Sequence, residues 1–387
     1  MRLTVLLGAL IALPALGTDF FVPSLPALAA SLSIDAAAAQ LTVTTYFAGL
    51  AAGQLLWGPL SDRYGRKPVL FAGLAIMLGS SLAALLAESV ASLSAARLAQ
   101  GLGMSSGAVI GRSVVRDLYA HEQAARMLAA MMIVFSIVPI TAPLAGALLT
   151  ASAGWRSIFG AMAAIAAVLL ACVAFGLAET APAARRSAHP VAIARTFAHI
   201  LGEPRFVAPF LLVLCCHVGI LAWVSNSALT LIRGMGVSPP AYGLMFAFVA
   251  TGQIVGAAAG TRLLLRLGAA RMMRLGAMLL LAAGGSAAAL AWAGVSHWSA
   301  VVPPFALFLF GSALLIPTAT AAALTPFPAA AGSASSLMGA IGFAAGALVS
   351  TALGAVFDGS ARPMASVAAL AGLAAMVFEK RLMRGKA

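Results

Sequence analysis

Two charged side chains, Asp19 and Arg97, lie inside long apolar stretches of the sequence. A charge inside a membrane costs roughly 3 kcal/mol or more, so it is expected to face a cavity or a partner of opposite sign. At 1.5 Å per helical residue the two side chains lie at similar depths in their stretches, so Arg97 is the expected partner of Asp19. Two interpretations remain open: an ion pair that only fixes helix packing, or a carboxylate whose proton affinity Arg97 and burial tune, so that it exchanges a proton or binds a cationic substrate.

A second group of charges occupies a short segment between two apolar runs of about 20 residues. Asp62, Arg63, Arg66 and Lys67 fall within six positions of one another. Gly58 and Gly65 flank these charges and permit close backbone approach or a positive φ. The pattern predicts a tight cytoplasmic hairpin loop, which either sets topology by its positive charge or takes part in gating.

Composition assigns the whole chain to the membrane. Of 387 residues, 62% are hydrophobic and 9% are charged, and the mean hydropathy is +1.04; soluble domains carry about 25% charged residues. The net charge of +13 is therefore interpreted as the basic bias of cytoplasmic loops and not as a nucleic-acid surface. The three cysteines and five histidines show no metal-ligand spacing, and no phosphate-binding glycine loop appears, so we expect no metal, no cofactor and no ATP-driven step.

Twelve apolar runs predict twelve membrane-spanning helices. Their approximate ranges are 4–26, 39–60, 68–87, 91–114, 127–150, 157–177, 206–231, 241–264, 271–293, 299–323, 333–356 and 363–380. With the N-terminus inside, 18 of the 23 Lys and Arg residues fall on the cytoplasmic side and 3 on the other, which supports an even number of spans with both termini cytoplasmic. The longest polar stretch divides the runs six and six, so we expect half-domains at 1–178 and 206–387, joined by a cytoplasmic linker at 179–205.

Several segments resemble known motifs. The residues Gly58, Leu60, Asp62, Arg63, Gly65, Arg66 and Lys67 match the G-x-L-x-D-R-x-G-R-K signature of the major facilitator superfamily. Residues 18–26 and 97–103 resemble the helix 1 and helix 4 motifs of its twelve-helix drug:proton antiporters, in particular the bicyclomycin- and chloramphenicol-resistance branch. Residues 139–146 resemble the antiporter motif of helix 5; Pro139, Pro143 and Gly146 are kept, whereas Ala142 and Ala145 stand where the family commonly has glycine.

The resemblance implies an all-α fold of two six-helix pseudo-repeat halves and assigns roles to residues. Asp19 and Arg97 would serve proton coupling. Asp62 would sit against the N-terminus of helix 11, where serines suit capping, and Arg66 would pair with Asp117, both contacts forming only when the halves close on the cytoplasmic side. The substrate cavity would involve a set of aromatic and amide side chains, whose alternative role is packing or a hydrogen bond between helices: Phe20, Tyr46, Phe47, Gln54, Asn226 and Gln253.

The expected function is secondary active export of small, mostly apolar compounds in exchange for protons, by a monomer in the bacterial inner membrane. Its partners would be the substrate, protons and lipid, and no nucleic acid. The alternative within transport is a proton-coupled exporter of a metabolite such as an amino acid or sugar. An integral-membrane enzyme would need clustered His and Asp residues, which are scattered here, and the gate motifs argue against a passive channel.

Overall fold

The computed structural model describes residues 2–181, 190–328 and 330–384, and all regular structure within them is helical. The α-helices in chain order are α1 (Arg2–Asp19), α2 (Leu25–Ser31), α3 (Ala36–Tyr64), α4 (Arg66–Leu85), α5 (Val90–Leu118), α6 (His121–Ala153), α7 (Arg156–Gly176), α8 (Pro190–Gly202), α9 (Pro204–Ala228), α10 (Pro239–Trp292), α11 (Val302–Leu324), α12 (Ala331–Ala355) and α13 (Arg362–Arg384). Three short helical turns accompany them, at Val22–Ser24 (η1), Leu229–Gly234 (η2) and Trp298–Ala300 (η3).

These helices make twelve spans. Nine segments of the described chain are long and apolar enough to cross a membrane. One of the nine, α10, is two spans, because Gly268 has a φ of 73° and turns the chain between 239–267 and 269–292. The less apolar helices α3 and α5 complete the set. The predicted all-α fold with twelve spans is confirmed, and most span ends lie within several residues of the expected positions.

The first span differs from its prediction. Residues 4–26 were expected as one helix, but α1 ends at Asp19, η1 follows, and α2 continues to Ser31. Pro23 and Pro26 each lie in the first turn of a new helix, which suits proline because the first turn needs no amide donor. Asp19 is therefore the last residue of a helix that is interrupted within the membrane.

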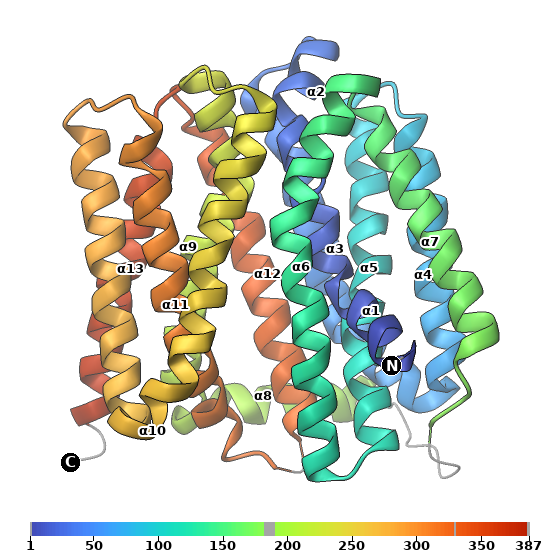
Figure 1. The fold of residues 1–387 in the computed structure, drawn as a ribbon. Helices are drawn as coiled ribbons and strands as arrows, with labels where there is room; N and C mark the ends of the chain where they lie inside the picture. Colours follow the sequence, from blue (N-terminus) through green and yellow to red (C-terminus); the bar gives the residue numbers. More distant parts are fainter. Residues whose placement is uncertain (1, 182–189, 329, 385–387) are drawn as a thin grey trace.

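The spans form two groups, which Figure 1 shows in blue to green and in yellow to red. In the first group, α1 packs on α5 and α6, α3 on α5, and α4 on α5 and α7; in the second, α10 packs on α11 and α13, and α9 on α11, α12 and α13. Helix α8, which the sequence interpretation did not include, lies crosswise at one end of the bundle, together with the turn within α10 (Figure 1). We call this end the basic end, because the loop from Asp62 to Lys67 and the four arginines near Gly268 belong to it.

At the opposite end the two groups are in contact, chiefly where α3 meets α12. The buried side-chain amide of Gln40 on α3 donates to the carbonyl of Ser225 on α9 at 2.8 Å and to the hydroxyl of Ser350 on α12 at 3.0 Å. Gly354 of α12 lies against Gln40, and an added Cβ there would lie 2.8 Å from the Cβ of Gln40. The missing side chain therefore allows these bonds to form between the groups.

We expect Gly354→Val to open the end of the bundle that Gln40 seals. A valine side chain cannot fit at this separation, so α12 must move away from α3 and the Gln40 bonds must lengthen. Distances between spin labels on exposed loops at that end should shift to longer values. Gly285→Val is the matched control, because no atom lies within 4 Å of an added Cβ at Gly285. Unchanged distances in Gly354→Val would show that the close approach does not hold this end shut.

Candidate functional site

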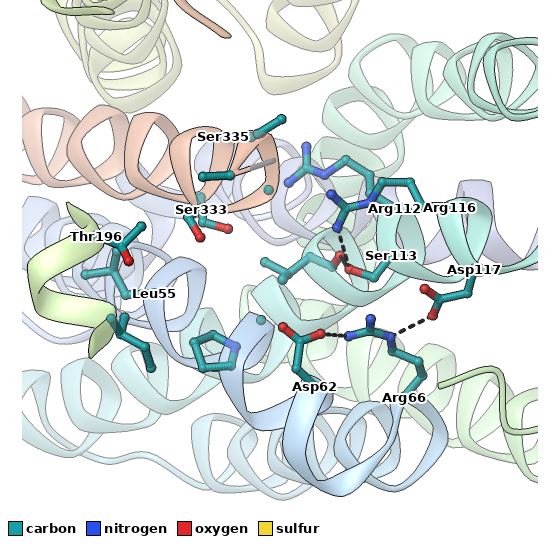
Figure 2. Close-up of a pocket in the computed structure, with 18 of the residues that line it drawn as sticks. Leu55, Asp62, Arg66, Arg112, Ser113, Arg116, Asp117, Thr196, Ser333 and Ser335 are labelled. Carbon is teal, nitrogen blue, oxygen red and sulfur yellow. Dashed lines mark hydrogen bonds and ion pairs between the residues drawn. The ribbon is translucent and has the colours of Figure 1, made fainter. Parts of the chain in front are cut away.

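A cavity of about 920 Å³ lies at the basic end, between the two groups. Its walls come from α3, α5, α8 and α12, with single contributions from α4, α6 and α11. Figure 2 shows the charged side chains gathered on the α3–α4 and α5 side of the cavity and the serines of α12 facing them. The cavity at this end and the sealed contacts at the other give the bundle one open and one closed end.

Arg66 organises the acidic side chains of the cavity (Figure 2). Its Nη1 donates to Asp62 at 2.5 Å and its Nε donates to Asp117 at 2.8 Å. Arg66 and Asp117 are nearly buried, with side-chain exposures of 8% and 13%, whereas Asp62 is 43% exposed. The predicted contact between Arg66 and Asp117 is confirmed. Gly58 also lines the cavity, and Arg63 instead lies exposed over the ring of Tyr64.

One part of the gating prediction is wrong. The Arg66–Asp117 bond was expected to form only when the two halves close at the basic end. Both residues belong to the first group, on α4 and α5, and their bond is present while the cavity exists. It therefore does not join the halves, and only Asp62 is left as a candidate for a contact that depends on closure.

The sequence interpretation missed an acidic residue that holds this loop. The carboxylate of Glu179, just after α7, accepts the backbone N–H groups of Arg66 at 2.8 Å and Lys67 at 3.2 Å, so it caps α4. Burial opposes ionisation of Glu179, but the backbone N–H groups of Ala181, Arg66, Lys67 and Thr180 outweigh it and hold its pKa below the ordinary value. The stabilisation that ionised Glu179 gives to the start of α4 is therefore fully present above the ordinary pKa of Glu. It is lost as the pH falls through the lowered pKa of Glu179.

The two loop residues are expected to give different phenotypes. Arg66→Ala leaves Asp117 nearly buried without its cation, which should lower the free energy of unfolding by roughly 3 kcal/mol. Because the bond lies within one group, Arg66→Ala should not change the distance between the groups. Asp62→Asn should keep the melting temperature and shift the population toward the state in which the basic end is open.

Thermal unfolding of the purified variants and distances between spin labels across the basic end test this pair. A distance change in Arg66→Ala as large as in Asp62→Asn would restore the original prediction that both contacts close the gate. Unchanged distances in Asp62→Asn at normal protein levels would leave the loop as a topology signal.

Asp19 lies deep in the bundle, with 5% of its surface exposed. Within the part of the chain that the structure describes, its carboxyl group has no hydrogen-bond or ion-pair partner. The turn that follows it, η1, contacts α6 of the first group and α9 and α10 of the second. A buried acid is thus placed where the two groups meet.

Arg97 is fully buried but makes no ion pair with Asp19. Its guanidinium donates to Gln100 at 2.5 Å, to the carbonyl of Gly17 at 3.0 Å and to the carbonyl of Thr42 at 3.4 Å. It also lies over three aromatic rings, with centroid distances of 4.1 Å to Tyr46, 4.4 Å to Phe21 and 5.9 Å to Phe159. The expected direct pair is therefore not formed, because backbone oxygens and π faces satisfy the guanidinium. Arg97 fixes the end of α1 two residues before Asp19.

The helix 5 motif lies within α6, which continues through Pro139 and Pro143. An added Cβ at Gly146 would overlap the carbonyl oxygen of Phe20, so this glycine lets α6 approach the chain just after Asp19. Ala145 is exposed, and a side chain at this position therefore does not enter that contact. The role of the motif in antiport stays a prediction.

The six predicted cavity residues do not line the cavity that the structure contains. Phe20, Tyr46, Phe47, Gln54 and Asn226 are buried and Gln253 is half-buried. The ring of Phe47 stacks on that of Phe343 of α12, with centroids 6.3 Å apart. The amide oxygen of Gln54 is buried beside Gly339 of α12 and has no hydrogen-bond partner among the described residues. Phe47 and Gln54 therefore lie where α3 meets α12, whereas the hydroxyl of Tyr46 donates to the carbonyl of Pro14 on α1, within the first group.

The arrangement of two helix groups around a cavity that is open at one end defines a class of protein, the polytopic helical transporters. The family model described as Major Facilitator Superfamily matches residues 7–378. The chain belongs to the major facilitator superfamily, and it is a transporter and not an enzyme.

Among similar curated proteins, the bicyclomycin resistance protein homolog of Haemophilus influenzae is 27% identical over 361 residues, which cover 92% of this chain and 90% of that protein. Multidrug resistance protein D of Escherichia coli is 29% identical over 346 residues, covering 88% and 85%.

Solved structures share the fold. The xylose transporter XylE of Escherichia coli, in a partially occluded inward-open conformation, aligns with a TM-score of 0.74 and 14% identity, covering 98% of this chain and 97% of that one. A POT family transporter aligns with a TM-score of 0.78 and 13% identity, covering 99% and 95%. The resemblance to the antiporter branch is confirmed by the curated relatives, and at these low identities the solved structures support the fold alone.

Proposed function

We propose that this chain exports small, mostly apolar compounds in exchange for protons by alternating access, in the bacterial inner membrane with both termini cytoplasmic. The resistance proteins among its relatives support the substrate class. The arginines and lysines that gather at the basic end support a cytoplasmic location for that end. The cavity would then face the cytoplasm, and the contacts of Gln40 would close the outer side.

We take residues 1–178 and 206–387 as the half-domains that move against each other, and 179–205 as their linker. Part of this linker, 182–189, lies outside the described residues, and α8 lies in its remaining part. The cavity between the groups and the contacts of α3 with α12 and of α6 with α10 provide the surfaces along which such a movement would occur.

The observation that carries the proposal is the Asp19 carboxyl group. It is buried between the two groups and holds no ion-pair partner among the described residues, so it can gain or lose a proton without breaking a fixed pair. Protonation or deprotonation changes the free-energy cost of burying the Asp19 carboxyl group. Because this cost differs between the open and the closed arrangement of the two groups, the proton can shift the balance between them.

Two assays test the proposed function. Inside-out vesicles that hold the chain should release protons from an acidified interior when a transported compound is added, and Asp19→Asn vesicles should not. A drug-susceptibility panel in an efflux-deficient bacterium would identify the compounds. If only amino acids or sugars cause proton release, the chain is a metabolite exporter and not a drug exporter. If no compound causes proton release, the proposed antiport is contradicted.

A further inference from the structure

Two arginines of the cavity make no bond with Arg66 or with its partners Asp62 and Asp117. Arg112 and Arg116 lie one turn apart on α5, and Figure 2 shows both side chains directed toward the first turn of α12. Arg112 is half-buried and has no hydrogen-bond or ion-pair partner in the described parts of the chain. For Arg116, one hydrogen bond is found, from Nη2 to the hydroxyl of Ser113 at 3.1 Å.

The cavity offers these two cations no carboxylate of their own. The acidic side chains among its described lining residues are Asp62 and Asp117, and Arg66 holds both. Like charges four residues apart on a helix repel each other, and the partial burial of Arg112 strengthens the repulsion because water screens it less. Arg112 and Arg116 thus leave two positive charges side by side without a counter-charge.

The first turn of α12 adds a third positive element. Serines were expected to cap this helix, but its N-cap is Ala330, which supplies no side-chain bond, so that expectation is wrong. Ser333, Ser335 and Ser336 instead lie among the residues that line the cavity. An added Cβ at Gly332 would lie 2.9 Å from Nη1 of Arg116, so the guanidinium touches the helix end, where the free N–H groups carry partial positive charge.

We propose that Arg112, Arg116 and the first turn of α12 form a binding site for an oxyanion, either a carboxylate or a phosphate. The planar guanidinium fork fits two oxygens of such a group, and serine hydroxyls and helix N–H groups can donate to the remaining lone pairs. The volume of about 920 Å³ holds an oxyanion that is free or part of a larger compound.

This site has a consequence for the transport cycle, which rests on the proposed function. In the closed state Asp62 is proposed to occupy the same end of α12. A bound oxyanion and Asp62 then compete for one helix terminus, so the oxyanion holds the basic end open.

Inorganic phosphate tests the site with the full chain in lipid nanodiscs at constant ionic strength, with chloride as the comparison salt. Phosphate should increase the open population, measured by spin-label distances across the basic end. Arg112→Gln and Arg116→Gln should each raise the half-saturating phosphate concentration at least tenfold. Arg266→Gln is the matched control, since Arg266 is an exposed arginine on α10 that does not line the cavity. Thermal unfolding checks that all three variants are folded.

Two results would overturn the site: no phosphate effect in the unmodified chain, or the same effect in Arg112→Gln as in Arg266→Gln.

Radiolabelled benzoate identifies the source of the anion. Accumulation of benzoate in inside-out vesicles would make the oxyanion part of a substrate, and binding of phosphate without benzoate transport would make it a free ion. If apolar compounds release protons from vesicles of the unmodified chain but phosphate has no effect, the site is overturned and the proposed function stands. If phosphate has its effect but no compound releases protons, the site stands and the proposed function does not.

Discussion

Asparagine in place of Asp19 is expected to abolish proton-driven export while the protein still inserts and folds. Asp19 is buried between the groups and has no ion-pair partner among the described residues, so the substitution removes a group that can change charge and breaks no ion pair. Asparagine has nearly the same shape, so packing around the end of α1 should be kept. Accumulation against a gradient should fall to the level of vesicles without the protein, measured with a labelled substrate.

Exchange without a gradient separates the two roles that Asp19 could have. Counterflow of labelled against unlabelled substrate needs no net proton movement, so Asp19→Asn should retain it if the residue serves coupling alone. Asp19→Glu keeps the carboxyl group and is the matched variant, with coupling expected at a reduced rate. Uphill transport by Asp19→Asn at the unmodified rate would remove Asp19 from the mechanism.

Alanine in place of Arg97 is expected to inactivate the transporter more severely than lysine does. The guanidinium bonds α5 to the carbonyl oxygens of Gly17 on α1 and Thr42 on α3. Alanine would leave these oxygens and Gln100 without their donor. Each lost hydrogen bond to a charged group lowers the free energy of unfolding by about 1.5–3 kcal/mol. Lysine keeps a charge and can donate in fewer directions, so the end of α1 should be held less firmly.

Export rates normalised to the amount of folded protein, together with thermal unfolding, measure this series. We expect the order of both activity and melting temperature to be unmodified chain, Arg97→Lys, Arg97→Ala. Arg266→Ala is a useful comparison, because it removes an exposed arginine that does not line the cavity. Equal and full activity of the two Arg97 variants would show that neither the charge nor its fork is needed.

Most of the fold could be predicted, because apolar runs indicate the membrane-spanning helices and loop charges indicate their orientation. The break after Asp19 could not, since prolines are tolerated in membrane helices and the run stays apolar through Pro26. Helix α8 was missed because the linker is polar on average. Its apolar residues Ile193, Phe197 and Ile200 recur with helical spacing, and that signal would have found it.

The site was predictable where two charged side chains bond directly, as Arg66 and Asp117 do. It was not predictable where a side chain bonds the backbone, because residue types do not reveal carbonyl oxygens such as those of Gly17 and Thr42. Equal depth suggested a pair of Asp19 with Arg97, but depth does not fix the direction in which a side chain leaves its helix. The cap that Glu179 provides for α4 depends on the fold that returns the end of α7 to this loop.

The cavity at the basic end has a further consequence, for hydration. At about 30 Å³ per molecule, its volume of about 920 Å³ corresponds to roughly 30 water molecules. A closure that removed the cavity would send this water back to the bulk and readmit it when the cavity reopened. Solutes too large to enter would draw water out of the cavity and favour the closed arrangement, so the osmotic pressure of the medium acts on the transport cycle as a thermodynamic variable in its own right.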